Sequence, residues 1–435
     1  MEQAITVMLL ERRTGGKVPD EKWSLWLREQ FAKNRPWHEL VRELVRVEGD
    51  PKQNPAAKLI ANEEQFDPDV VTQTIGRLFL GMDLKCVQCH DHPNVERFKQ
   101  ADYFGILSFL RGTKPDTDKE TKQPRMADAA LPEKVEFKSV FASEAEFTAP
   151  HLPGVQPVSF TAEAKPLGRA KLAEELPSPT NERFVQNAVN RFWWLLMGRG
   201  LVHPLDRLHA GNPPSHPEVM ALLCREFVAH SFDVKWLLRE IALSETYQRS
   251  SRAPEGVKSD GIPAESYRIA NMRPLSAEQL AQSMMSALGE LAAMKDAKEA
   301  DFTVRSYITG TAKAPPASVG GVQNVFAAIF GNPAGEPEIE FAPGMAHTLF
   351  LMNDRMMLTW LIPNDHNLIG RLAKLEKSSD AVADEMYLSV LTRLPDADEK
   401  GEVAAHLAKD ASRRDAALGE LVWALLAGAE FRLNH

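Results

Sequence analysis

Residues 67–90 read DPDVVTQTIGRLFLGMDLKCVQCH. Asp67-Pro68-Asp69 has the composition of a helix start, and the apolar side chains that follow recur at helical spacing as far as Gly81, a residue typical of helix ends. The stretch therefore predicts an amphipathic helix that is followed at once by Cys86-Val87-Gln88-Cys89-His90. If these five residues continue as helix, Cys86, Cys89 and His90 share one face.

The pattern C-x-x-C-H at residues 86–90 is the signature by which haem is attached covalently in c-type cytochromes. Each cysteine adds to a vinyl group of the porphyrin, and the histidine becomes an axial iron ligand. The chain has 435 residues, three cysteines and twelve histidines, so chance gives this pattern with a probability on the order of one in a thousand. The sequence predicts haem c bound through Cys86, Cys89 and His90. A porphyrin also needs an apolar groove at this place, which we expect to be lined by residues such as Leu80, Phe98, Tyr103 or Leu107.

The same loop leaves two alternatives open. A zinc site would use His90 and His92 with the two cysteines, although four ligands within seven residues form a cramped tetrahedron. The cysteines would otherwise be structural thiols without a cofactor. His92 becomes a second axial iron ligand only if the chain folds sharply back, so we interpret it as a hydrogen-bonding histidine beside the site. A thioredoxin-like motif is disfavoured because no βαβ pattern surrounds the cysteines.

Composition and charge bound the class of protein. Hydrophobic residues make up 44% and charged residues 26% of the chain, as in ordinary globular proteins. The net charge of -9 disfavours a nucleic-acid partner, because no basic surplus exists to neutralise phosphates. No apolar run reaches the ~20 residues needed to cross a bilayer. Cys224 lies in an apolar helical pattern and is expected to be a small buried hydrophobe.

The chain pattern predicts a mainly α protein with two helical domains joined by a Pro-rich segment. The first domain spans 1–112, with helices at Trp23–Phe31, Trp37–Val45 and Tyr103–Leu110 besides the one before the cysteines. The segment 113–177 contains two to four short strands, among them Val135–Val140 and Val155–Phe160. The second helical domain spans 178–435 and ends in helices around Leu349–Leu361, Ala381–Thr392, Glu399–Lys409 and Ala416–Leu426.

Two helix starts in the second domain carry a capping-box pattern, in which a serine caps the helix and the third residue after it reaches back. The first is Ser215-His216-Pro217-Glu218. The second is Ser276-Ala277-Glu278-Gln279, flanked by Leu275 and Leu280, which fit a hydrophobic staple.

A weaker functional hypothesis concerns hydrolysis. Asp206, His209 and His216 follow Asn190-Arg191 closely enough for a polar cleft in which a carboxylate and a histidine perform acid–base chemistry. A structural role is favoured, because His216 lies at a helix start and Arg191 can pair with Asp206. The usual hydrolase and nucleotide-binding signatures are missing from the sequence.

Several stretches together resemble a paired domain-of-unknown-function family that is abundant in planctomycete bacteria and commonly lies downstream of a planctomycete cytochrome C domain. The stretches that resemble the first domain of that family are Phe79-Leu80-Gly81, residues 86–93 and Asp102–Gly105. Those that resemble its second domain are Asn181–Phe184, Asn190–Trp193, Gly198–Gly200, Pro213–Glu218, Ser244–Tyr247, Arg273–Leu280 and Glu430–His435.

The resemblance implies an exported, haem-linked protein that is periplasmic or otherwise extracytoplasmic, with a redox partner protein or a co-expressed enzyme as its partner. It brings no established reaction. The stretch Phe330–Gly335 lacks the cysteine pair that family members often carry there. Residues 4–10 are apolar but lack a basic leader and a cleavage site, so no signal peptide is recognised and the first domain is expected to lack its beginning.

Overall fold

The computed structural model describes residues 1–62, 65–159, 166–258, 261–294, 303–336, 344–375, 378–409 and 411–434. These residues are mainly helical, which confirms the predicted fold class, and their strands are short and antiparallel. The chain divides into two compact units. One consists mainly of Met1–Asn271, and the other mainly of Met272–Pro333 and the C-terminal part of the chain. Each unit has its own apolar core.

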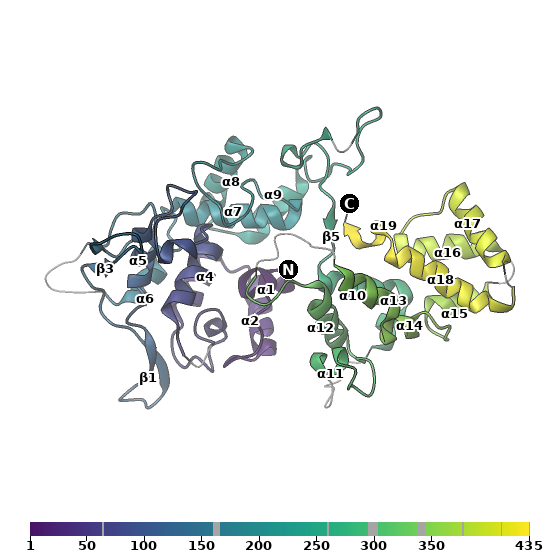
Figure 1. Cartoon of the computed structure of the whole chain (residues 1–435), viewed down its shortest axis with the longest axis horizontal. Coiled ribbons are helices and arrows are strands. Elements are labelled where there is room, and N and C mark those ends of the chain that lie inside the picture. Colours follow the sequence, from purple (N-terminus) through teal and green to yellow (C-terminus); the bar gives the residue numbers. More distant parts are fainter. Residues whose placement is uncertain are drawn as a thin grey trace. The chain divides into compact units, whose positions relative to one another are not determined.

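The first unit is built from helices, with two small hairpins between α5 and α6 (Figure 1). In chain order its helices are α1 (Glu2–Leu10), α2 (Asp20–Ala32), α3 (Trp37–Arg46), η1 (Pro55–Lys58), α4 (Pro68–Leu80), η2 (Cys86–Gln88), α5 (Gln100–Ser108), α6 (Gly168–Glu175), α7 (Glu182–Met197), α8 (Pro217–Ala229), α9 (Val234–Leu243) and η4 (Ala264–Ser266). The predicted helices before residue 113 correspond to α2, α3, α4 and α5.

Helix α4 begins and ends as its sequence predicts. The side chain of Asp67 caps it by accepting hydrogen bonds from the backbone N–H groups of Asp69 and Val70, and Pro68 occupies the first helical position. Gly81 ends it in the left-handed region, with a φ of 64°, which a glycine adopts without steric cost. The helix thus delivers the chain to the cysteine loop at a fixed point.

Helix α7 joins the later part of this unit to α4 through buried polar side chains. Asn187 Nδ2 donates to the carbonyl of Leu78 at 2.7 Å, and Arg191 Nη2 donates to the carbonyl of Arg77 at 2.7 Å. Through these contacts and the shared apolar core, residues 168–271 belong to the first compact unit. The compact units therefore divide the chain differently from the predicted domains 1–112 and 178–435.

The segment between α5 and α6 holds two hairpins. Strand β1 (Lys114–Thr117) pairs with β2 (Pro124–Ala127), and β3 (Val135–Phe137) pairs with β4 (Glu146–Thr148). A strand was also predicted at 155–160, but residues 155–159 form none, and Phe160 lies outside the described residues. Alternation of apolar residues is not enough there, because this stretch finds no partner strand with which to share backbone hydrogen bonds.

The second unit is helical apart from one short pair of strands, β5 (Arg273–Pro274) and β6 (Leu433–Asn434). Its helices are α10 (Ala277–Leu288), η5 (Glu290–Ala293), α11 (Val304–Ile308), α12 (Val319–Phe330), α13 (Met345–Asn353), α14 (Arg355–Trp360), α15 (Leu368–Lys374), α16 (Ser379–Leu391), α17 (Ala397–Ala408), η6 (Ala411–Arg413), α18 (Arg414–Ala427) and α19 (Ala429–Arg432). The helix predicted at Leu349–Leu361 is two helices, because Asp354 caps α14.

The two predicted capping boxes have different outcomes. Ser276 caps α10, its hydroxyl accepting from the N–H of Gln279, whose side chain accepts in turn from the N–H of Ser276. The box at Ser215 is wrong. Helix α8 begins at Pro217 with His216 as its N-cap, and no side chain caps it. Proline prefers the first helical position, so the start of α8 lies one residue later than the serine requires.

Within the part of the chain that the structure describes, no helix combines the length and apolar character needed to traverse a lipid bilayer.

Candidate functional site

The cysteine loop follows α4 and is anchored by apolar side chains. Leu84 and Val87 are fully buried, whereas Cys86 and Cys89 are exposed free thiols and His90 is half-buried. The helix does not continue through the loop, in which only Cys86–Gln88 form a short 3₁₀ turn. The buried valine between the cysteines fixes this turn to the core while both sulfurs stay accessible to a reactant.

Polar side chains from α4 and α5 hold the loop from below. The carboxylate of Asp69 accepts from Gln88 Nε2 at 3.3 Å and from the hydroxyl of Tyr103. Gln100 Nε2 donates to the carbonyls of Gln88 (3.1 Å) and Lys138 (3.3 Å). Burial, together with the hydrogen bond to Asp69, raises the pKa of Tyr103, so this phenol stays protonated and acts as a donor.

Asp91 fixes the end of the loop to the start of α5. Its carboxylate accepts from the backbone N–H of Gln100 at 2.9 Å and from Lys99 Nζ at 2.9 Å. Partial burial works against the charged form, but these two hydrogen bonds outweigh it and lower the pKa of Asp91. The residue is therefore an anion at neutral pH and holds the backbone on the C-terminal side of His90.

His90 has the hydrogen bond that a metal-ligating histidine needs. Its Nδ1 lies 2.6 Å from the backbone carbonyl of Asp91. A carbonyl can only accept, so Nδ1 carries the proton and Nε2 presents its lone pair. Histidines that bind metals commonly donate their other N–H to a carbonyl or carboxylate in this way, which fixes the tautomer.

His92 has the opposite tautomer. Its Nδ1 accepts from the backbone N–H of Asn94 at 3.1 Å, so the neutral ring carries its proton on Nε2. Neither nitrogen then offers a free lone pair, which favours the interpretation of His92 as a hydrogen-bonding residue. Among the described residues, no group of three or more His, Cys, Asp and Glu side chains is placed to hold a metal ion.

A porphyrin beside the loop was expected to lie in a groove lined by Leu80, Phe98, Tyr103 or Leu107. That expectation is wrong. All four side chains are at most 2% exposed, because they form the packed core between α4, α5 and the loop rather than its surface.

Apolar surface beside the loop comes instead from the chain after β3. Val140 donates its N–H to the carbonyl of Cys89 at 2.9 Å, and the ring of Phe141 lies 5.2 Å from that of His90. These two side chains are 65% and 83% exposed. Neither residue could be assigned to the loop from the sequence, since the apolar alternation at 135–140 indicates a strand but not which loop the end of that strand contacts.

The residues of the hydrolase hypothesis have separate neighbours. His209 lies against Phe98, with ring centroids 5.6 Å apart, and His216 lies against Tyr267, at 5.7 Å. The charge of Asp206 acts on the buried Arg191, raising the pKa of that guanidinium, although desolvation prevails and lowers it to about 10. Within the described part of the chain, no hydrogen bond or ion pair joins the side chains of Asp206, His209 and His216.

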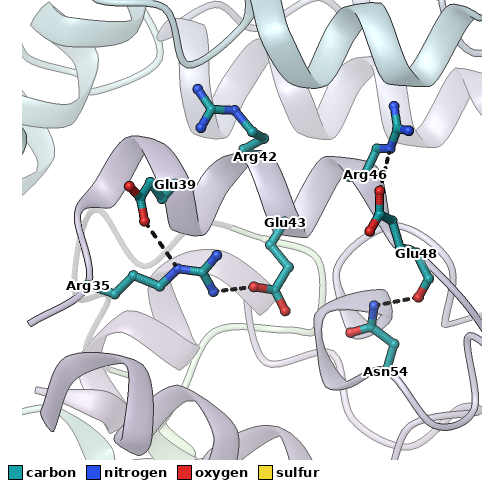
Figure 2. Close-up of a pocket in the computed structure, with 7 residues that line it drawn as sticks. All are labelled: Arg35, Glu39, Arg42, Glu43, Arg46, Glu48 and Asn54. Atoms are coloured by element: carbon teal, nitrogen blue, oxygen red, sulfur yellow. Dashed lines mark hydrogen bonds and ion pairs between the residues drawn. The ribbon is translucent and has the colours of Figure 1, made fainter. Parts of the chain in front are cut away.

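A separate hollow of about 430 Å³ lies along α3 and is lined by Arg35, Glu39, Arg42, Glu43, Arg46, Glu48 and Asn54. Figure 2 shows that most of these residues bond one another, Arg35 with two glutamates and Glu48 with Arg46 and Asn54. The arginine and glutamate charges cancel, and the lining contains no thiol or imidazole. The hollow therefore offers no reactive group comparable to the cysteine loop.

Two family models match the chain. The model PSD1, described as a protein of unknown function (DUF1553), matches residues 168–407, which is more than half of the chain. The chain belongs to the DUF1553 family. The model PSCyt2, described as a protein of unknown function (DUF1549), matches residues 11–115 and so contains the cysteine loop. No curated protein and no solved structure matches the chain.

The DUF1553 match and the compact units have different boundaries. Residues 168–271 belong to the DUF1553 match but pack with the DUF1549 match in the first unit. His209 of the DUF1553 region and the cysteine loop of the DUF1549 region consequently lie in one packed body. The surroundings of the loop are therefore formed by both family regions.

Proposed function

We propose that this chain is a c-type haem-binding, extracytoplasmic protein that takes part in electron transfer or redox chemistry. The observation that carries the proposal is the donor set of one loop, in which two free exposed thiols precede an imidazole whose Nδ1 donates to a backbone carbonyl. A bound haem would supply one-electron redox chemistry at its iron.

Each residue of the loop has a defined part. The sulfurs of Cys86 and Cys89 would each add across a vinyl group, the sulfur bonding to one carbon and the thiol hydrogen passing to the other, so no oxidant is consumed. Nε2 of His90 would supply the imidazole donor to the iron. Val140 and Phe141 would shield the imidazole side of the site from water, as their apolar, exposed side chains lie beside Cys89 and His90.

Localisation and partners follow from the same chemistry. Covalent haem attachment normally takes place outside the cytoplasm, and the resemblance to exported proteins agrees with this. A redox partner protein or a co-expressed enzyme would exchange electrons with the site. Its specific reaction stays open in this proposal.

A second candidate function is a binding or assembly protein with a metal, or no cofactor, at the Cys/His loop. It is favoured by an exposed apolar stripe on α13, formed by Met345, Leu349 and Met352 at spacings of four and three residues. Side chains at these spacings share one helix face, and exposed apolar patches commonly mark interaction sites.

Haem attachment can be tested by exporting the protein together with haem-maturation factors and recording a pyridine haemochrome spectrum and the intact mass. We expect a c-type band and a mass increased by one haem. Cys86→Ala with Cys89→Ala should abolish both, whereas Cys224→Ala, which removes a half-buried thiol, should keep them. An unmodified protein with stoichiometric zinc would overturn the proposal in favour of a metal site, and an unmodified, metal-free protein would favour the binding or assembly function.

A further inference from the structure

Arg183 is a half-buried cation without a carboxylate partner. It lies in the first turn of α7, and its Nη1 donates to the backbone carbonyl of Leu208 at 2.8 Å. Among the described residues, no carboxylate lies within ion-pair distance of it. Burial lowers the pKa of Arg183, the charge of Asp102 opposes this, and the charge of Arg97 adds to the lowering. The guanidinium thus has spare N–H groups that have lost part of their water.

The nearest acid is already engaged. Oδ1 of Asp102 lies 3.2 Å from Nε2 of His151, and Oδ2 accepts from the backbone N–H of Lys99 at 3.4 Å. This carboxylate also serves as the capping residue of α5. The charge of Asp102 acts on Arg183 only at a distance, so Asp102 accepts no hydrogen bond from the guanidinium.

Two further arginines and a histidine, whose pKa is lowered by burial and by the neighbouring arginine charges, lie near the same point. Arg97 and Arg207 are exposed and form no ion pair among the described residues, and Arg97 acts on Arg183. His209 follows the residue that Arg183 binds, and its ring lies edge-on to Phe98, as does the ring of His92. In a chain of net charge -9, none of these three arginines forms an ion pair with a described carboxylate.

We propose that Arg183, with Arg97 and His209 beside it, forms a binding site for an oxyanion, that is, a carboxylate or phosphate group. A guanidinium recognises two oxygens of such a group through parallel hydrogen bonds, and these are strongest where water is partly excluded. The N-terminal end of α7, a helix of 16 residues, adds its positive dipole end. The buried ring of Phe98 packs edge-on against His209 and so holds that imidazole in place.

Two sources can supply this chemistry. One is a carboxylate side chain of a porphyrin held at the cysteine loop, which carries His92 two residues after His90; this source rests on the proposed haem function. The other is a free dianion such as phosphate, which requires no haem. The two differ in what must be bound first, so they can be separated by experiment.

The anion site itself is tested on the haem-free full chain by calorimetric titration with inorganic phosphate at constant ionic strength. We expect saturable binding that Arg183→Gln weakens at least about tenfold, the size expected for a lost charge-assisted hydrogen bond. The matched control is Arg225→Gln, which removes an exposed arginine paired with Glu226 and should leave binding unchanged. Equal affinities of the two variants, or no saturable binding by the wild type, would overturn the site. Arg97→Gln, on an exposed position, should weaken binding to a smaller extent and serves if Arg183→Gln does not fold.

The source is tested by adding mesoporphyrin or its dimethyl ester and following porphyrin fluorescence. Tighter binding of the free acid than of the ester, with the difference lost in Arg183→Gln, supports the porphyrin carboxylate. Phosphate binding without such a difference supports a free dianion. Failure of haem attachment leaves the phosphate titration intact, so failure of the proposed function and failure of this site give different results.

Discussion

Lys58 and Arg183 are two shielded cations of the same compact unit, and their surroundings differ. Lys58 is 1% exposed, and its three N–H groups meet the carbonyls of Gly15 (2.9 Å) and Val18 (2.8 Å) and the carboxylate of Asp20 (2.6 Å). Arg183, with five N–H groups, has one hydrogen bond to a described residue. The protein itself supplies hydrogen-bond acceptors for all three N–H groups of Lys58, whereas most N–H groups of Arg183 have no acceptor among the described residues.

The difference separates a structural charge from one that is available to a ligand. Burying a charge costs free energy unless partners replace the water it loses. Lys58 has such partners and joins η1 to the loop before α2. Arg183 has only one, so the fold retains a cation that it could have paired.

The comparison breaks if the two cations contribute equally to stability. Lys58→Met leaves the carbonyl of Val18 without its donor and removes one donor each from the carbonyl of Gly15 and the carboxylate of Asp20. We expect it to lower the free energy of unfolding by about 3 kcal/mol. Arg183→Met should change it by less than about 1 kcal/mol, because the lost hydrogen bond is offset by relief from burying the charge. Urea unfolding of both variants measures this. A larger loss for Arg183→Met would mean that this guanidinium is structural.

The pair His151–Asp102, in which the protein itself supplies the partner of the charged group, makes the free energy of unfolding depend on pH. Burial disfavours the protonated imidazole, but hydrogen bonds to Asp102 and to the carbonyl of Ala149 outweigh it and raise the pKa of His151 above 6.5. Protonation therefore stabilises the fold below pH 6.5, and this contribution is lost as the pH rises through the folded pKa.

We expect His151→Gln to cost about 1 kcal/mol more at pH 5.5 than at pH 9, measured by urea unfolding at both values. In the Asp102→Asn background the difference between the two pH values should shrink. A cost that is the same at both pH values in the wild-type background would show that the pair does not stabilise the protonated histidine.

Ser276 and Ser215, two serines near helix starts, allow the same comparison for neutral groups, because only one of them caps a helix. Ser276 closes a backbone N–H of α10, so Ser276→Ala should lower the free energy of unfolding by about 1 kcal/mol. Ser215 caps no helix, its hydroxyl lying 3.1 Å from Nδ1 of His216, and Ser215→Ala should stay within about 0.5 kcal/mol of the wild type. Thermal unfolding compares the two, and the reverse order would contradict the assigned start of α8.

The smallest effect on stability is expected at the open cysteines. Cys86→Ser with Cys89→Ser should change the free energy of unfolding by less than about 0.5 kcal/mol, because both side chains are exposed. In the wild type, iodoacetamide at pH 8 should modify these two thiols and spare Cys224, since burial raises the pKa of Cys224 to about 12. Mass spectrometry of peptides counts the modified sites. Labelling of Cys224 at the same rate would contradict its shielding.

Helix positions could be predicted because they depend on residues close together in the sequence. Asp67 and Gly81 bound α4 as expected, and Ser276 caps α10. The error at Ser215 has a local cause too, since Pro217 determines where α8 begins. Local chemistry is thus sufficient for element starts when two competing signals are weighed correctly.

The surroundings of the candidate site could not be predicted in the same way. The loop's sulfurs and His90 were identified from their spacing, and their exposure leaves them available. The predicted apolar lining of the haem site was wrong, because Phe98 and Tyr103 are buried in the core. The apolar side chains that do lie beside the loop belong to residues 140–141. His209 and Phe98 lie far apart in the sequence and meet only in the fold, which no sequence spacing reveals.

Gln100 joins three segments through one residue, with its N–H on Asp91 and its side-chain amide on the carbonyls of Gln88 and Lys138. Because of these bonds, we expect the cysteine loop, the start of α5 and the residues directly after β3 to unfold locally as one cooperative unit. The loop cannot detach without also releasing the hairpin. In hydrogen–deuterium exchange, the amides of Cys89 and Val140 would then lose protection together. A partner protein that binds the hairpin would therefore also change the exposure of the cysteine sulfurs.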